Sequence, residues 1–149
     1  MAQQKDVGGK PPLRRRAVAV GLLKVSSGTR RALRGGRVEK GDPVAAGELA
    51  GLLAMKRTPD LIPHCHVVGL TKSRVDITVS NAGVRVRAEA EALDRTGVEM
   101  EALVGASVAL LTVWDMVKYL EKDARGRYPS TSLGPVRVLS KTKTAVDER

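Results

Sequence analysis

The chain has 149 residues, of which 42% are hydrophobic and 28% are charged. These values are typical of one globular domain with its own core, and they exclude wholesale disorder. Only three residues are aromatic, Trp114, Tyr119 and Tyr128, so the core must consist of Leu, Val, Ala and Met, and a platform on which single-stranded nucleic-acid bases stack is disfavoured.

The net charge of +10 suggests a polyanionic partner, but the charge lies at the two ends of the chain. Residues 1–40 carry +9, residues 41–120 carry −2 and residues 121–149 carry +3. Two interpretations remain open. The ends are either a frayed terminus and a solvated surface, or the arginines around 13–16 and the C-terminal lysines converge on one phosphate-rich ligand.

The first predicted elements follow a polar arm. Residues 1–12 hold a Gly-Gly pair and a Pro-Pro pair and are predicted to form a basic arm that is flexible or becomes ordered on assembly. Residues 13–149 are predicted to form one domain. Alternation within 15–25 predicts a strand, and 27–33 predicts a short helix closed by the Gly-Gly pair at 35–36.

A longer helix is predicted next. Asp42, followed by a proline, is a favourable N-cap, and the helix is predicted to run to about Lys56. Its glycines Gly47 and Gly51, four residues apart, leave room for another backbone to pack closely. The Thr-Pro-Asp sequence at 58–60 is predicted to end the helical run.

The second half of the chain predicts a hairpin, a helix and a last strand. Segments 74–79 and 84–93 alternate around a turn at 81–83, residues 99–121 have the strongest helical periodicity, and 135–141 predict the final strand. The predicted apolar stripe of the helix consists of Met100, Leu103, Ser107, Leu110, Trp114 and Val117. This order of elements is typical of an α+β domain with helices on one face of an antiparallel sheet.

Cysteine and hydropathy patterns favour an intracellular setting. Cys65 is the only cysteine, so an intrachain disulfide and zinc-finger spacing are excluded. The longest uncharged run, Ala102–Trp114, has thirteen residues, which suits a buried helix and is too short to span a bilayer. Arg14–Arg16 is not followed by the apolar region of a secretory signal. The sequence predicts a cytoplasmic protein without a membrane partner.

An acid and a lysine follow the apolar part of the predicted helix. Asp115 and Lys118 are three residues apart and share one helical face. Desolvation would lower the pKa of the lysine and raise that of the carboxylate, whereas mutual attraction opposes both shifts. The pair is therefore either a proton-transfer pair that works near neutral pH or an ordinary surface ion pair.

The start of the same helix carries Glu99, Met100 and Glu101. Acids in a first turn compensate the helix dipole, and free N–H groups there can instead hold an anion or a polar ring edge. Asp115 is fourteen residues beyond Glu101, about 21 Å along an ideal helix. One helix cannot bring both carboxylates to one small ligand, so a shared site needs a second chain.

His64, Cys65 and His66 form another candidate cluster. In extended backbone the two histidines share a face, but a zinc site needs further ligands and the sequence has no other His or Cys, so no metal is predicted. Hydrogen bonding or phosphate contact is favoured over Cys–His catalysis, because adjacent side chains on a strand point apart. Lys40 precedes a helix start and is either a phosphate contact or simply exposed. P-loop and GxGxxG motifs are absent.

Three blocks together resemble one family. They read KGDPVAAGELAGLLAMKRTPDLIPHCH at 40–66, TGVEMEALVGASVALLTVWDMVK at 96–118 and GPVRVLSK at 134–141. In this order they resemble the signature blocks of the molybdenum cofactor biosynthesis protein C family, the cyclic pyranopterin monophosphate synthases. The resemblance runs from about Arg15 to Lys141.

The resemblance implies a ferredoxin-like α+β subunit that assembles as a homohexamer, a trimer of dimers, with active sites at the dimer interfaces. It implies a lyase reaction in which a 3′,8-cyclised dihydro-GTP is converted to cyclic pyranopterin monophosphate, the precursor of molybdopterin, with release of pyrophosphate. The implied partner is this GTP-derived small molecule, and no redox cofactor is implied.

The resemblance also implies roles for individual residues. Asp115 and Lys118 match the family's D-M-x-K motif, Lys40 matches its lysine before Gly-Asp, and these three are the implied catalytic residues. The implied substrate-binding residues are His64, Cys65, His66, Glu99, Met100, Glu101, Arg15 and Lys141.

Three departures from the family pattern stand out. The family often ends in a Gly-Gly-Lys-Ser-Gly type of loop, whereas this chain reads KTKTAVDER at 141–149, where Lys143 is the candidate replacement. A polar insertion at 125–132 lengthens the connection to the last strand and is predicted to lie on the surface. Trp114 and Val117 stand where Tyr and Cys are frequent.

The rival interpretation is a small basic nucleic-acid-binding protein. It accounts for the sequence pI near 10.3 and for the basic first forty residues. It also predicts basic residues spread over one face, whereas the segment 41–120 is net acidic.

Overall fold

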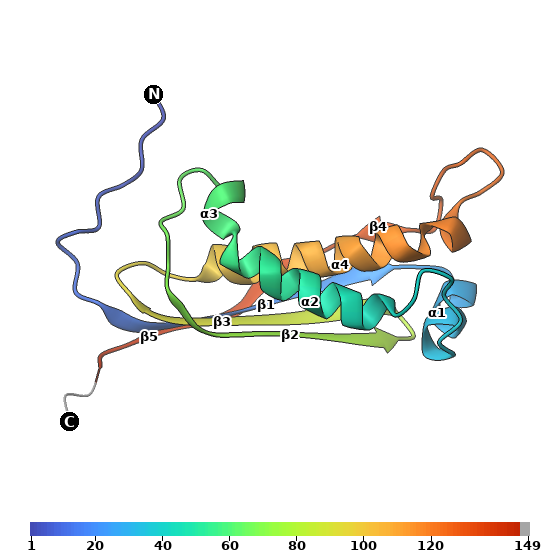
Figure 1. The fold of residues 1–149 in the computed structure, drawn as a ribbon, viewed down its shortest axis with the longest axis horizontal. Helices are drawn as coiled ribbons and strands as arrows, with labels where there is room; N and C mark the ends of the chain where they lie inside the picture. Colours follow the sequence, from blue (N-terminus) through green and yellow to red (C-terminus); the bar gives the residue numbers. More distant parts are fainter. Residues whose placement is uncertain (147–149) are drawn as a thin grey trace.

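The central strand of the sheet is β1 (Leu13–Lys24), which follows the N-terminal arm. It pairs antiparallel with β3 (Gly83–Asp94) on one side and with β5 (Arg137–Thr144) and the two-residue β4 (Ser132–Leu133) on the other, and β2 (Leu70–Ser80) is the edge strand beyond β3. This computed structural model describes the chain as far as position 146. Figure 1 shows the strands in one layer.

The helices cover one face of this sheet. The two long helices, α2 (Pro43–Lys56) and α4 (Glu99–Glu121), lie side by side across the face (Figure 1), whereas α1 (Ser27–Arg34) lies near one end of the sheet and the single turn α3 (Thr58–Leu61) follows α2. The prediction of an α+β domain with helices on one face of an antiparallel sheet is confirmed.

Local capping explains where α2 begins. The Oδ1 atom of Asp42 accepts hydrogen bonds from the backbone N–H groups of Val44 and Ala45 at 3.0 and 3.1 Å, and Pro43 fills the first turn. An N-cap carboxylate satisfies N–H groups that have no partner within the helix, and proline at the first position loses none. The predicted start and end of this helix are confirmed.

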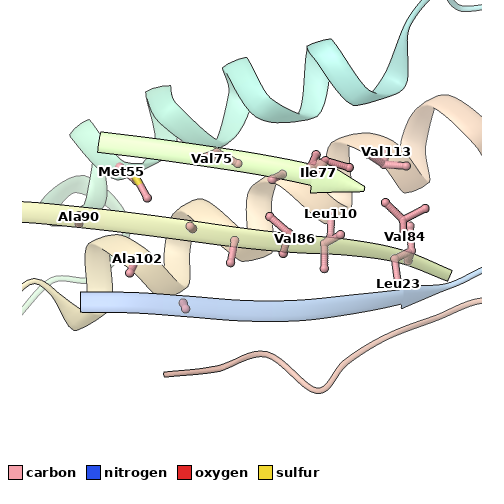
Figure 2. Packing of buried hydrophobic residues seen from close by; sticks show 14 of the residues in the cluster. Leu23, Met55, Val75, Ile77, Val84, Val86, Ala90, Ala102, Leu110 and Val113 are labelled. Carbon is pink, nitrogen blue, oxygen red and sulfur yellow. The ribbon is translucent and has the colours of Figure 1, made fainter. Parts of the chain in front are cut away.

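The core between the sheet and the long helices consists of small and branched aliphatic side chains together with Met55 of α2 (Figure 2). Alanines of β1 and β3 face each other across the strand pair, with Ala17 opposite Ala90 and Ala19 opposite Ala88, and all four are buried. Because the spacing between packed elements depends on the side chains at the contact, alanines allow α4 to lie close to the strands.

The buried stripe of α4 differs from the predicted one. Leu110 and Val117 are fully buried as predicted, but Met100 is 41% exposed and Leu103 and Trp114 are half-buried. The stripe that lies deepest consists of Ala102, Ala106, Ala109, Leu110, Val113 and Val117. The large residues that defined the predicted stripe therefore lie beside the buried face of α4. Alanines occupy the centre of that face, where the helix lies nearest to the sheet.

By length and composition, α4 would also be able to cross a membrane. In this fold it is instead the central core helix, with its deepest residues packed on β1 and β3. Its apolar composition follows from contact with a sheet on one side and with α2 on another.

Several boundaries differ from the predictions. The long helix ends before the Thr-Pro-Asp sequence, as predicted, but this sequence itself forms the single turn of α3, because proline fits the first turn of a helix. β2 spans Leu70–Ser80 and is longer than the alternating segment 74–79, and β5 runs to Thr144, beyond the predicted end at 141. The short β4 was not predicted, since two residues carry no periodic signal.

Glycines set the contact between α2 and α4. A Cβ at Gly47 would lie 2.9 Å from the Ala109 carbonyl oxygen, and a Cβ at Gly51 would lie 2.9 Å from the Gly105 carbonyl oxygen. Both glycines are buried. Backbone-to-backbone packing of the two helices, the consequence expected from the spacing of these glycines, is confirmed.

We expect Gly51→Ala to lower the free energy of unfolding by about 1–3 kcal/mol, because the new methyl group meets a backbone carbonyl that cannot move aside. The control is Gly28→Ala in α1, where the nearest atom to the new Cβ is Ser26 Oγ at 3.8 Å. Urea unfolding of both variants measures the difference. Equal stability of the two variants would contradict close helix packing.

Candidate functional site

The predicted site residues gather at the two ends of α4. Asp115 and Lys118 lie near its C-terminal end, together with Lys40 from the loop before α2. Glu99 to Glu101 form the first turn of α4, at the opposite end of the helix (Figure 1). The segment that follows α3 and the C-terminal part of β5 lie next to this turn. The 23-residue helix separates the two groups.

The first group, which we call the acid–lysine cluster, consists of Lys40, Asp115 and Lys118. Lys118 Nζ lies 2.7 Å from Asp115 Oδ1 and Lys40 Nζ lies 3.7 Å from Asp115 Oδ2. Lys40 Nζ also donates a hydrogen bond to the Asp115 backbone carbonyl at 3.1 Å. Two ammonium groups thus flank one carboxylate.

Mutual attraction dominates the electrostatics of this cluster. The Asp115 side chain is 60% exposed and that of Lys118 is 40% exposed, so desolvation is weak. The hydrogen bond from Lys118 lowers the pKa of Asp115, and Asp115 raises the pKa of Lys118. In this structure Asp115 and Lys118 therefore form an exposed ion pair, and the proton-transfer interpretation stays a prediction.

All three aromatic residues of the chain lie around the acid–lysine cluster, which the sequence analysis did not predict. The Tyr119 hydroxyl accepts a hydrogen bond at 2.9 Å from the backbone N–H of Glu39, next to Lys40. Trp114 packs edge-to-face against Tyr128 of the 125–132 insertion, with ring centroids 5.7 Å apart. The available signal was that Trp114 and Tyr119 border the D-M-x-K motif on both sides.

The second group lines a cleft rich in cations. It has a volume of about 180 Å³ and its walls include Arg15, Arg16, Lys141 and Lys143. Lys141 Nζ lies 3.2 Å from Glu99 Oε1, so β5 and the first turn of α4 are tied together here. The predicted convergence of both basic chain ends is therefore found in the fold.

Arg15 also holds one wall of this cationic cleft in place. Its guanidinium donates hydrogen bonds to the backbone carbonyls of Asp94 and Arg95 at 3.3 and 3.2 Å. These residues form the connection from β3 to α4, so the arginine of the first strand positions the start of the helix. Lys143, the candidate replacement for the family's C-terminal loop, lines the same cleft. Residues 147–149 lie outside the described part of the chain.

A second cleft of about 160 Å³ adjoins the first, since both are lined by Gly97 and Glu99. We call it the histidine cleft. Seven of the residues that line it belong to the two predicted motifs, namely His64, Cys65, His66, Gly97, Glu99, Met100 and Glu101. The LIPHCH and GVEME motifs, more than thirty positions apart in sequence, thus face one space.

Burial changes the acid–base properties of the histidine cleft. Desolvation, reinforced by the charges of Glu99 and Asp94, raises the pKa of the buried Glu101 carboxyl. Burial, together with the charge of Glu101, raises the pKa of the Cys65 thiol. Glu101 is therefore a carboxyl group able to carry a proton closer to neutral pH than an exposed glutamate does.

The backbone of the LIPHCH motif is not a strand. The Cys65 N–H donates to the Ile62 carbonyl at 3.0 Å, which makes a turn, and the chain stays irregular until β2 begins. Both histidine rings nevertheless contact the same partner, the N-terminal arm. Within positions 1–146, no group of three or more His, Cys, Asp or Glu side chains is arranged to hold a metal ion.

An α+β subunit with a cation-lined cleft and an acid–lysine cluster is typical of an enzyme subunit that handles an anionic substrate. The chain belongs to the MoaC family, whose model matches residues 4–144.

Relatives from several archaea are similar over most of their length. The chain is 47% identical over 138 residues to a probable cyclic pyranopterin monophosphate synthase of Archaeoglobus fulgidus, covering 93% of this chain and 88% of the relative. Proteins of the same name from Pyrococcus furiosus and Aeropyrum pernix are 46% and 48% identical, again over 93% of this chain and over 88% and 94% of the relatives.

We expect Tyr119→Phe to loosen the loop that carries Lys40, because the Glu39 N–H loses its acceptor. The amide of Glu39 should exchange with solvent roughly fivefold faster, which corresponds to about 1 kcal/mol for one hydrogen bond. Hydrogen–deuterium exchange measured by NMR or mass spectrometry tests this. Tyr128→Phe is the matched control, and an equal change in both variants would contradict the assignment.

Proposed function

We propose that this protein is a cyclic pyranopterin monophosphate synthase of molybdenum cofactor biosynthesis, and that it works in the cytoplasm. The substrate is a 3′,8-cyclised dihydro-GTP, and the products are cyclic pyranopterin monophosphate and pyrophosphate. The main support is that this member of the MoaC family has two adjoining clefts, one lined by cations and one by groups that can carry protons.

The cationic cleft is proposed to bind the triphosphate. Arg15, Lys141 and Lys143 lie on its walls, and fixed cations stabilise the negative charge that develops when a ribose hydroxyl attacks the α-phosphorus and pyrophosphate leaves. Lys141 exchanges its Glu99 partner for phosphate oxygens in this scheme. A histidine of the adjoining cleft, His64 or His66, contributes a further donor.

The histidine cleft is proposed to hold the ring system. Backbone and side-chain atoms of Glu99, Met100 and Glu101 offer polar contacts to its edge. The raised pKa of Glu101 suits a group that keeps a proton or shares one with a ring nitrogen. With so few aromatic residues in the chain, polar contacts rather than stacking dominate binding of the ring.

The acid–lysine cluster is proposed to transfer protons while the five-membered ring of the purine opens and the pterin forms. Asp115 and Lys118 are the acid–base partners, and Lys40 assists ring opening or proton delivery. A partner subunit that covers this exposed cluster would remove water and strengthen each electrostatic interaction within it.

We propose that each active site combines the acid–lysine cluster of one subunit with the cationic and histidine clefts of another. The support is the length of α4, whose ends hold the two groups. The proposed assembly is a homohexamer, a trimer of dimers, of ferredoxin-like subunits, with the sites at dimer interfaces. The antiparallel sheet with two long helices on one face is compatible with such a subunit.

The alternative, a small basic nucleic-acid-binding protein, has no support in the fold. The basic residues of the cationic cleft stand beside Glu99 and line a small concave space instead of a broad face.

Incubation of the purified protein with the cyclised dihydro-GTP should release pyrophosphate and form the cyclic pterin phosphate. Asp115→Asn should lower turnover at least about 100-fold, because proton transfer by a positioned group contributes that much, and should leave the assembly intact. Asp60→Asn, at an exposed aspartate of α3, is the control. Loss of the assembly in the Asp115 variant would show that Asp115 is structural.

Mixed assemblies test the shared site. Asp115→Asn and Lys141→Ala subunits, each inactive alone, should regain about a quarter of wild-type turnover after random mixing, because half of the dimers are mixed and each has one intact site of two. The control mixture combines Asp115→Asn with Lys118→Ala, both in one cluster, and should stay inactive. Equal results from the two mixtures would place the whole site within one subunit.

A further inference from the structure

The N-terminal arm contacts the two histidines with its backbone. The carbonyl oxygen of Gln3 lies 2.8 Å from Nδ1 of His64, and the carbonyl oxygen of Lys5 lies 2.6 Å from Nε2 of His66. Alternate residues of the arm thus contact alternate residues of the LIPHCH motif. We call residues 3–8 the strap.

Gln4 lies between these two carbonyl groups, and here the arm donates the hydrogen bonds and the LIPHCH motif accepts them. Its side-chain Nε2 donates to the Cys65 backbone carbonyl at 2.7 Å and to the His64 carbonyl at 3.4 Å. Gln4 is the residue whose side chain, rather than backbone, holds the strap on the motif. Three consecutive residues of the strap are therefore matched to three consecutive residues of the histidine cleft.

The strap is also fixed at its other end. The Arg95 guanidinium donates a hydrogen bond to the Gly8 carbonyl, and the Asp6 carboxylate accepts one from the Gly8 N–H at 2.7 Å. Arg95 directly precedes Thr96, which lines the histidine cleft opposite the LIPHCH motif. The strap thus bridges the two walls of that cleft.

These contacts decide which nitrogen of each ring carries a proton. A carbonyl oxygen only accepts, so the ring nitrogen that faces it must be an N–H group. His64 is then protonated on Nδ1 and His66 on Nε2, and the remaining nitrogens, Nε2 of His64 and Nδ1 of His66, are the ones able to exchange protons with a ligand. The two rings are held in opposite tautomers.

We propose that the strap is a positioning segment of the active site, which fixes the orientation and the opposite tautomers of His64 and His66, and that Gln4 is its positioning residue. The contribution to turnover rests on the proposed function, whereas the tautomers rest on the hydrogen bonds alone. The arm thereby acts through geometry rather than through its positive charge.

The tautomers are measured on the full chain, produced without a histidine tag and labelled with ¹⁵N at histidine. The chain has two histidines, and the variant His64→Gln assigns the two sets of imidazole signals. At about pH 8, above the ordinary imidazole pKa, we expect one ring protonated on Nδ1 and the other on Nε2. The split should disappear in Gln4→Ala and in a chain that lacks residues 2–8. Identical tautomers in the full chain would overturn the proposal.

Turnover of the cyclised dihydro-GTP tests the positioning role. Gln4→Ala and Gln4→Glu should lower kcat/KM by roughly 10- to 100-fold, the effect of small misplacements of reacting groups, with the fold and assembly size unchanged. The control is Lys10→Ala, at an exposed lysine of the same arm outside the strap, which removes a positive charge and leaves the strap contacts in place. This variant should stay within about twofold of the wild type.

Each outcome has a separate meaning. A loss of kcat/KM in Lys10→Ala as large as that in Gln4→Ala would show that the charge of the arm matters, and it would overturn the positioning role of the strap. An unchanged kcat/KM in both Gln4 variants would likewise overturn the positioning role of the strap. If the wild-type protein does not turn over this substrate, the proposed function fails, and the tautomer spectra still decide whether the strap sets the histidines.

Discussion

The close packing of α4 against a surface of small residues is the constraint on which the remaining structure depends. Alanines of β1 and β3 lie beneath the helix, and Gly47 and Gly51 of α2 lie beside it at backbone distance. Contacts of this kind fix the position of a helix, because backbone and Cβ atoms cannot move aside as the end of a long side chain can. The helix is therefore a rigid element whose two ends have fixed positions.

This rigidity organises the chemistry. The C-terminal part of α4 presents an exposed carboxylate between two lysines, and its first turn forms the wall shared by the cationic and histidine clefts. Burial raises the pKa of Glu101 at one end, while ion pairing lowers that of Asp115 at the other. Two carboxyl groups with opposite shifts suit different proton-transfer roles, and the distance between them is the support for the proposal of a site shared by two subunits.

Much of the fold was predictable because its signals are local. Asp42 with its following proline located α2, and alternation located the β2–β3 hairpin. The acid–lysine cluster was predictable in part, since Asp115 and Lys118 are neighbours on one turn. The tie from Tyr119 to the backbone beside Lys40, the ring contact of Trp114 with Tyr128 and the strap were not, because each joins segments that no periodicity relates.

The sequence by itself determined the α+β class, the composition of the core, the family blocks and the residues expected to act on the substrate, because caps, periods and motifs are properties of neighbouring residues. Only the tertiary structure decided how the basic chain ends meet in one cleft and which carboxyl group is buried. It also decided that the arm engages both histidine rings through the backbone carbonyls of Gln3 and Lys5, with the Gln4 side chain bound to the backbone between them. Those features depend on desolvation and on hydrogen bonds between segments about sixty residues or more apart, which arise only when α4 packs on the sheet and the chain ends come together.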